Sequence, residues 1–299
     1  MASSGIGGQA VMEGVMMKNQ DRYAVAVRKP DQTILVKQEE FVSICKNEAL
    51  RKLPVFRGVI NFVDSLVLGM KTLTFSASFF EEEEEQDERA KNKEQAAMGL
   101  MVFVSIVMAI GIFMVLPFLI SQLFQKLIPN QTLVILLEGI IRLGIFILYI
   151  VLISRMREIK RLFMYHGAEH KCINCIEHGL ELNVENVRSS SKEHKRCGTS
   201  FLFFVILISI VVALFIRVDS GVLRLLLRLL LIPVIAGVSY EIIRLAGRSE
   251  NPLVNLLSKP GMWMQHLTTK EPEDDMIEVG IASVEAVFDW RSYLQSQQK

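Results

Sequence analysis

The sequence predicts an α-helical integral membrane protein with four transmembrane helices, a small N-terminal β-hairpin or sheet, an interfacial helix and a helical cytoplasmic segment at the C-terminus. Of the 299 residues, 51% are hydrophobic. The mean hydropathy is +0.35, which is too apolar for an ordinary soluble domain. The 22% of charged residues are too many for a bundle of spans alone. Soluble segments are therefore expected beside the membrane part.

The N-terminal region, residues 1–97, is expected to combine strands with one helix. Residues 22–39 alternate apolar and polar side chains on both sides of a turn at 29–32, which is the pattern of a β-hairpin. Residues 53–80 read as a long helix, but charged residues interrupt its apolar run. We expect this helix to be amphipathic and to lie at the membrane interface, with a spanning helix as the alternative. The acidic run 81–85 indicates a solvated linker.

Four later segments are long and apolar enough to span a membrane, which takes roughly 20 helical residues. They lie at about residues 98–120, 132–155, 199–217 and 222–244. The spans form two transmembrane hairpins, 98–155 and 199–244, on either side of a loop at 156–198. A helical segment, 245–299, completes the chain.

The distribution of charge predicts the orientation of these spans. The 156–198 loop is rich in Lys and Arg, whereas the connection at 121–131 contains only Lys126. Because basic loops stay in the cytoplasm, we expect a multi-pass protein of the cell membrane with both termini cytoplasmic. The four cysteines would then be unpaired in a reducing compartment. The net charge of +1 gives no reason to expect nucleic acid.

Charged residues also lie inside the predicted spans. Glu138 and Arg142 are one helical turn apart, and so are Arg224 and Arg228. Charges within a membrane must find partners, so these pairs predict either an ion-pair network that holds the bundle or a polar path into the bilayer.

The C-terminal segment carries signals for two helices. Asn251 and Pro252 have the residue types of a helix cap and first position. Trp263 suggests that this first helix lies at the membrane interface. A last helix is expected from about Pro272, because acidic residues follow where the helix dipole favours them.

The densest group of ligand-type side chains is FMYHGAEHKCINCIEHG, residues 163–179. His166, Glu169 and His170 form an HxxEH pattern, on a helix expected to continue from the second span despite Gly167, which costs about 1 kcal/mol. Residues four apart share one helix face, so both imidazoles can hold one ion. The pattern predicts zinc or another divalent metal, with the two histidines as ligands and the glutamate as the catalytic base.

The sequence leaves the third ligand open. Glu177 shares the histidine face but lies about 10 Å along the axis from His170. Better candidates come from elsewhere in the chain: His194, Glu13 and Glu185. Glu13, in the glycine-rich stretch GIGGQAVMEGVMM, is also a candidate catalytic base, although turn residues are common in such a stretch.

Three alternatives compete for the same loop. Cys172, Cys175, His194 and Cys197 have nearly the spacing of a structural zinc site. Cys197 with His194 as its base is a candidate nucleophile, because the neighbouring Arg196 and a helix start can lower a thiol pKa. The simplest alternative is that these side chains only anchor the loop.

Several motifs resemble the YqhQ-like family of bacterial membrane proteins of unknown function. The matching stretches, from about Gly7 to Val287, are GGQAVMEGVMM, RGVINFVDSLVLGMKTL, EGIIR, YHGAEHK, ENVR, RCGTSF, PGMWMQHLTTKEP and IEVGIASVEAV. Lys195 stands where the family pattern has proline. The resemblance implies a metal-dependent enzyme and functional roles for Gln9, Glu13, Glu138, Arg142, His166, Glu169, His170, His194, Arg196 and Cys197.

Two functional hypotheses follow. The first is a membrane-embedded, metal-dependent hydrolase of zinc type that acts at the cytoplasmic membrane face, with a peptide or lipid-linked substrate. The second is a non-catalytic accessory protein, embedded in the lipid bilayer, that binds another membrane complex such as the protein-export channel or its docked ribosome. Metal content separates the two hypotheses.

Overall fold

The computed structural model describes residues 4–80, 88–216, 218, 220–249 and 251–297. These residues divide into two compact units. The sheet unit comprises Met1–Phe80, Val151–Val205 and Pro233–Lys299, and the helix unit comprises Glu81–Ile150 and Ile206–Ile232. The acidic run predicted to be a linker, 81–85, falls outside the described residues.

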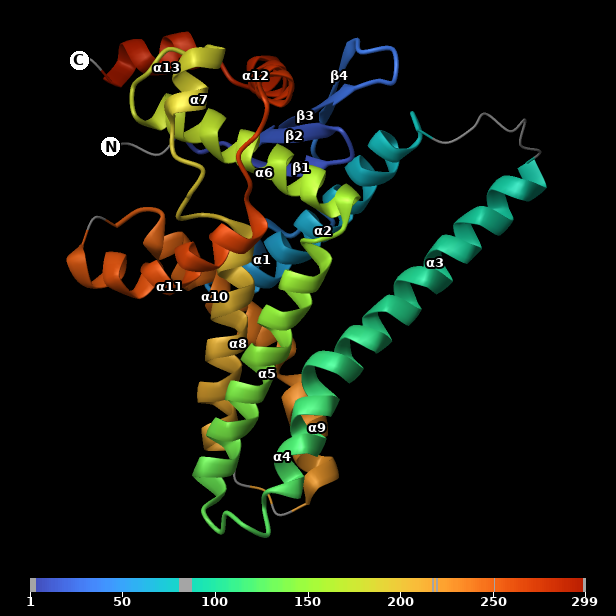
Figure 1. Cartoon of the computed structure of the whole chain (residues 1–299), viewed down its shortest axis with the longest axis vertical. Coiled ribbons are helices and arrows are strands. Elements are labelled where there is room, and N and C mark those ends of the chain that lie inside the picture. The colour runs from blue at the N-terminus through green and yellow to red at the C-terminus, as the bar shows by residue number, and fades with distance from the viewer. Residues whose placement is uncertain (1–3, 81–87, 217, 219, 250, 298–299) are drawn as a thin grey trace. The chain divides into compact units, whose positions relative to one another are not determined.

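The sheet unit contains a four-stranded antiparallel sheet in the order β1-β2-β3-β4 (Figure 1). Its strands are β1 (Gly7–Val11), β2 (Gly14–Asn19), β3 (Arg22–Arg28) and β4 (Ile34–Glu40). The predicted hairpin is confirmed as β3 and β4. The glycine-rich stretch, which the sequence suggested was turn-like, instead forms β1 and β2. Only its centre turns, at Glu13, whose φ is 48°.

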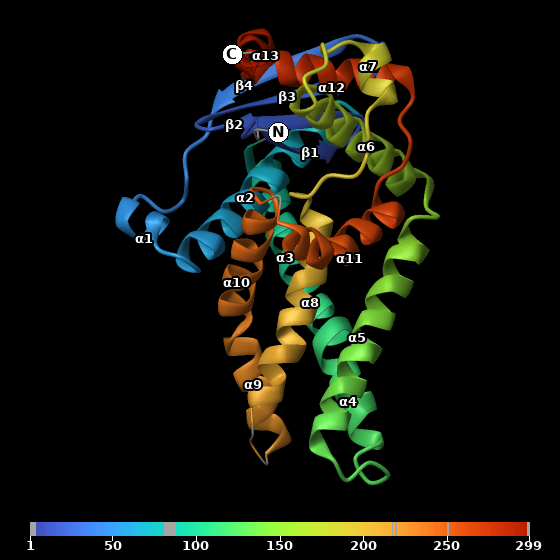
Figure 2. The ribbon, with the colours of Figure 1, turned by 90° about the vertical axis from the view of Figure 1, so that its left-hand side faces the viewer.

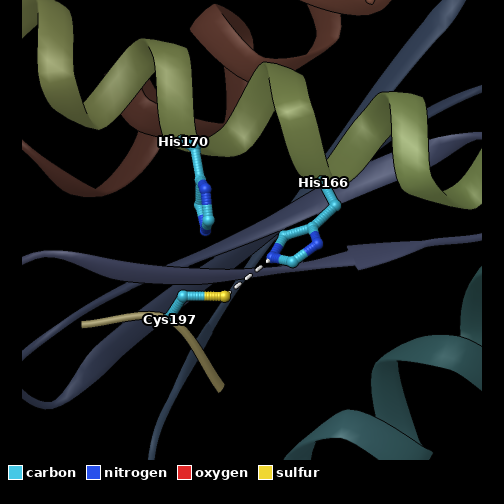
Figure 3. A group of neighbouring side chains, drawn as sticks. All are labelled: His166, His170 and Cys197. Atoms are coloured by element: carbon cyan, nitrogen blue, oxygen red, sulfur yellow. Dashed lines mark hydrogen bonds between the residues drawn. The ribbon is translucent and has the colours of Figure 1, made fainter. Parts of the chain in front are cut away.

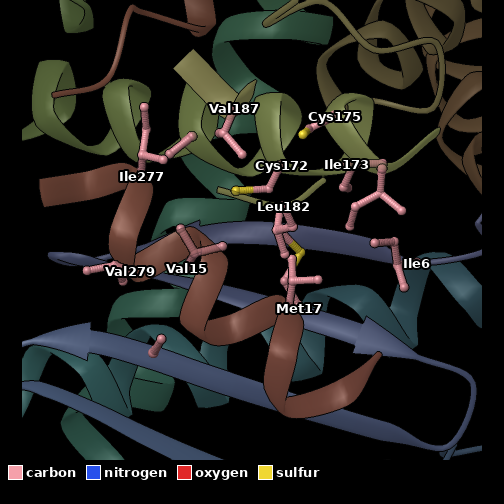
Figure 4. Packing of buried hydrophobic residues seen from close by; sticks show 14 of the residues in the cluster. Ile6, Val15, Met17, Cys172, Ile173, Cys175, Leu182, Val187, Ile277 and Val279 are labelled. Atoms are coloured by element: carbon pink, nitrogen blue, oxygen red, sulfur yellow. The ribbon is translucent and has the colours of Figure 1, made fainter. Parts of the chain in front are cut away.

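Helices cover both faces of this sheet (Figure 2). One face packs against α6 (Arg157–Glu177) and α12 (Asp274–Val287), and the other against α2 (Phe56–Ala77). Successive strand residues point to opposite faces. Val15 and Met17 therefore belong to the core beneath α6 and α12 (Figure 4), whereas Met16 belongs to the core against α2. Each such buried side chain contributes about 1.5–3 kcal/mol, so the sheet gives α6 a rigid support.

Shorter elements complete the sheet unit. They are α1 (Glu48–Lys52), α7 (Val184–Ser189), α11 (Pro252–Thr268) and α13 (Trp290–Gln297). The predicted cap of α11 is confirmed, because the Asn251 side chain accepts a hydrogen bond from the Leu253 N–H and Pro252 is the first helical residue. The last predicted helix is confirmed as α12, with Asp274 and Asp275 in its first turn.

Six further helices and one π-helical turn make up much of the rest of the described chain. They are α3 (Glu88–Ile110), which continues through the π-helical turn (Gly111–Val115) into α4 (Leu116–Leu123), α5 (Gln131–Ile153), α8 (Gly198–Phe215), α9 (Gly221–Leu230) and α10 (Ile232–Ala246). Among the described residues, four helices are long and apolar enough to cross a membrane: 56–77, 99–123, 131–153 and 198–215. Counting α9 and α10 together as one span gives up to five.

Two local predictions differ from the structure, and a third is not tested by it. The predicted span at 222–244 is broken at Leu231, because Pro233 lacks the N–H that would continue the helical hydrogen bonds. The charged residues from Glu88 onward, predicted to belong to the linker, begin α3. The helix at 56–77 meets the length and composition of a span, so its interfacial position stays a prediction.

Candidate metal centre

Helix α6 presents the HxxEH residues from a rigid rod that is separate from α5. The expectation that one helix continues through this region is wrong: α5 ends at Ile153, and α6 begins after Met156, whose ψ of 137° is extended. The helix then passes through Gly167 without a break. A side chain at Gly167 would overlap the carbonyl oxygen of Lys270, so glycine lets the segment after α11 lie against α6.

Backbone carbonyls fix both imidazoles of this helix. His166 Nδ1 lies 2.9 Å from the Thr268 carbonyl oxygen, and His170 Nδ1 lies 2.6 Å from the Lys192 carbonyl oxygen. A carbonyl oxygen only accepts hydrogen bonds, so each Nδ1 carries the proton. When a ring with this tautomer is neutral, its Nε2 lone pair is available to a metal, as is usual for histidine ligands whose other nitrogen donates to a carbonyl.

Cys197 completes a three-residue cluster with these imidazoles (Figure 3). His166 Nε2 is 3.4 Å from Cys197 Sγ, and the centroids of the His166 and His170 rings are 4.4 Å apart. One nitrogen from each ring and the sulfur all lie within 4.8 Å of one another. Bonds of about 2.0–2.1 Å to nitrogen and 2.3 Å to sulfur place tetrahedral zinc ligands about 3.5 Å apart. The donor atoms and their spacing therefore fit zinc.

Charge within the cluster favours a thiolate. Burial alone would raise the pKa of the Cys197 thiol, but the positive charges of His166 and His170 hold it well below its usual range. Burial alone would lower the pKa of His166, but the Cys197 thiolate raises it to about 9. Without metal, the proton is thus held on imidazole while sulfur is already in its metal-binding form.

Glu169 is placed beside the same atoms. Its Oε2 lies 3.9 Å from His166 Nε2 and 3.7 Å from His170 Nε2, and only 5% of the residue is exposed. Strand β1 supports it from below, since an added Cβ at Gly8 would lie 2.6 Å from Glu169 Cγ. The HxxEH residues thus share one site, with the carboxylate next to the ligand nitrogens.

The structure places the other two predicted site residues in different contacts. His194 is outside the three-residue cluster: its Nε2 lies 3.4 Å from Glu177 Oε2, and its ring centroid is 5.7 Å from that of His170. Glu13 forms two 2.5 Å hydrogen bonds with Arg161. Neither side chain is therefore held toward the cluster, and Cys197 occupies the third corner.

The alternative four-residue zinc site is not formed. Cys172 and Cys175 belong to the hydrophobic core that α6 shares with α12 (Figure 4), and a Cβ at Gly280 of α12 would be 2.9 Å from Cys172 Sγ. Burial raises the pKa of both thiols. The Cys172 sulfur is thus packed as an apolar group, whereas the Cys175 thiol donates to the Glu181 carbonyl oxygen at 3.4 Å. Helical spacing puts both cysteines on the opposite side of α6 from the histidines.

Cys197 is the candidate ligand that sequence spacing did not assign to the histidine pair. It precedes α8, far from α6 along the chain, and only folding brings the two together. Gly167 inside HGAEH does not mark this approach, because the backbone beside it belongs to Lys270.

A neighbouring ionic cluster makes stability depend on acid pH. Burial alone would raise the pKa of Glu177, but the hydrogen bond from His194, the charge of Arg196 and the hydrogen bonds from Ser4 lower it from 4.5 to about 2. Ionised Glu177 therefore favours the folded state above pH 4.5, and its contribution is lost as pH falls toward 2. In thermal unfolding from pH 6 to pH 2.5, Glu177→Gln should lose less stability than the wild type.

Glu158→Gln, a change at an exposed carboxylate of the same helix, controls for the altered net charge. Parallel curves of stability against pH for the wild type and Glu177→Gln would show that Glu177 is not the group whose lowered pKa makes stability depend on acid pH.

Comparison with known proteins now places the chain in a family. A family model described as "Protein of unknown function (DUF1385)" matches residues 53–290. The chain belongs to this family. The DUF1385 chain is also 35% identical to "Uncharacterized protein YqhQ" of Bacillus subtilis (strain 168), over 98% of this chain and 95% of that protein. The resemblance noted from the motifs is therefore confirmed at the level of the family. No solved structure gives a significant match.

Proposed function

We propose that His166, His170 and Cys197 bind one zinc or similar divalent ion and that the protein is a metal-dependent hydrolase. The observation that carries this proposal is the convergence of two carbonyl-anchored imidazoles and a thiolate within 4.8 Å. Three protein ligands leave a fourth tetrahedral position for water, which is the arrangement of catalytic rather than structural zinc. A bound zinc ion supplies Lewis acidity and lowers the pKa of that water to about 7.

Glu169 is proposed as the general base. Its carboxylate lies next to the ligand nitrogens without being part of the three-residue cluster, so it is placed to take a proton from the attacking water. The same carboxyl group can then return the proton to the leaving group. Proton transfer by a positioned carboxylate of this kind contributes about 10²–10⁴-fold in rate.

The proposed site works at the cytoplasmic surface of the cell membrane. Membrane-length helices support insertion, and the basic loop that contains α6 supports a cytoplasmic site with both termini on that side. The substrates proposed are peptides or lipid-linked molecules, because either class can reach a site beside a membrane span.

Metal content of the purified full-length protein tests the proposal. Elemental analysis of the wild type in detergent should find about one zinc-type ion per chain, the number that one three-ligand site holds. His166→Ala with His170→Ala should abolish it, and so should Cys197→Ser, which changes little in size. His266→Ala, at an exposed imidazole in α11, should keep the metal. Metal-free wild type that copurifies with a large membrane complex would favour the accessory hypothesis instead.

A further inference from the structure

The helix unit buries more positive than negative charge at one place. Glu138 and Arg142 on α5 lie with Arg228 on α9, and each residue is less than 8% exposed. Arg228 Nη1 is 2.5 Å from both Glu138 carboxylate oxygens, and Arg142 Nη2 is 2.8 Å from Glu138 Oε1. The Glu138 carboxylate thus faces two guanidinium groups. We call Arg142 and Arg228, which carry them, the arginine pair. One carboxylate and two guanidinium groups give the cluster a formal charge of +1.

Hydrogen bonding within this cluster is incomplete. Among the described residues, no hydrogen-bond partner exists for Arg142 Nε or for Arg228 Nε and Nη2, although all three atoms are buried. Arg142 Nη1 donates to Ser209 Oγ at 2.7 Å, so the unpartnered donors belong mostly to Arg228. Unpaired charged donors in a low-dielectric interior cost several kcal/mol, which predicts an additional acceptor.

The cluster also lies within reach of a membrane surface. Glu138 is seven residues from the start of α5 at Gln131, and Arg228 is seven from the start of α9 at Gly221, which places each about 10 Å from its helix end. Both helices begin after loops of the helix unit, so we expect their first residues to contact water or lipid headgroups. Arg224, one turn nearer the α9 start, binds the Val218 carbonyl oxygen at 2.7 Å and adds positive charge on this side.

We infer that the arginine pair binds an oxygen-rich anion of the phosphate class, either a lipid headgroup phosphate or free phosphate. A planar guanidinium presents paired N–H donors that match two oxygens of such a group. The free Nε and Nη2 of Arg228 are such a pair, on one edge of its guanidinium. The anion supplies both the missing acceptors and the missing negative charge. This site is separate in sequence and chemistry from the metal centre.

Binding to the full-length protein tests the inference in two arms. Delipidated protein in neutral detergent is titrated with phosphatidylglycerol and followed by native mass spectrometry. The same protein is incubated with radiolabelled inorganic phosphate in equilibrium dialysis. Saturable binding of one phosphatidylglycerol per chain assigns the lipid, and saturable binding of phosphate without lipid assigns the free ion. Either result supports the arginine pair as a phosphate-class site only if the variants below respond.

Three variants connect the binding to Arg228. Arg228→Gln should weaken the anion at least tenfold, while Arg142 keeps its bond to Glu138. Arg228→Lys keeps the positive charge but loses the paired N–H donors of the guanidinium, so its affinity for the anion should fall between those of the wild type and Arg228→Gln. This variant also tests the inference if Arg228→Gln does not fold. Lys126→Gln removes the same charge from an exposed loop of the helix unit and should bind like the wild type. No saturable anion binding, or equal affinity in all four proteins, would overturn the inference.

Discussion

Replacing Gly167 with alanine is expected to destabilise the sheet unit and to release the metal. The new methyl group would overlap the Lys270 carbonyl oxygen, which belongs to the segment bound to α6 through the Lys270 N–H and the Phe163 carbonyl oxygen at 2.9 Å. Overpacking of this kind costs about 1–3 kcal/mol. Because Thr268 in the same segment holds His166 Nδ1, its displacement should also remove one anchored imidazole.

Thermal unfolding and elemental analysis of the same sample measure both effects. Gly144→Ala is the matched control, since nothing lies within 4 Å of a Cβ at that position of α5. The control should be neutral or more stable, by up to about 1 kcal/mol, because alanine favours helix. A Gly167→Ala protein with wild-type stability and full metal content would show that the close approach does not position the site.

Replacing Glu138 with glutamine is expected to produce the second large effect. It leaves Arg142 and Arg228 buried beside each other without the carboxylate that both of them contact. Removing one partner of a buried ion pair typically costs about 3–5 kcal/mol, because the remaining charge is uncompensated. Thermal unfolding in neutral detergent measures the loss.

The double variant Glu138→Gln with Arg228→Gln provides the control. It removes one of the two facing positive charges, so it should be more stable than Glu138→Gln alone, and the two changes should be strongly non-additive. If the two losses simply add, the charges do not interact and the cluster has been misassigned. If the arginine pair binds a phosphate-class anion, an anionic lipid should restore part of the stability that Glu138→Gln loses.

Local patterns predicted those features that depend on neighbouring residues. The HxxEH spacing correctly placed His166 and His170 together because a helix repeats every 3.6 residues, and the Asn251 cap and the acidic first turn of α12 followed equally local rules. Cys197 could not be assigned to the histidine pair, because its approach depends on how α8, α11 and α6 pack. Spacing alone matched it instead to Cys172, Cys175 and His194.

Two other differences have identifiable physical causes. The glycine-rich N-terminus has low intrinsic strand propensity, yet pairing with β3 and close packing of Gly8 beneath Glu169 hold it in β1 and β2. Pro233 indicated a break between α9 and α10. The high hydropathy of the surrounding residues nevertheless favoured the prediction of one unbroken span. At the N-terminus tertiary packing outweighed the average propensity of the segment, and at Pro233 one missing backbone N–H did so.

X-ray absorption spectroscopy at the metal edge of the wild-type protein measures the ligands of the proposed ion. We predict a four-coordinate zinc-type ion with two imidazole nitrogens at about 2.0–2.1 Å, one sulfur at about 2.3 Å and one light oxygen ligand. Cys197→Ser should remove the sulfur shell, whereas Cys175→Ser should leave it unchanged. A first shell without sulfur, a first shell with two or more sulfurs, or wild-type protein with no bound metal would contradict the proposed His166, His170 and Cys197 site.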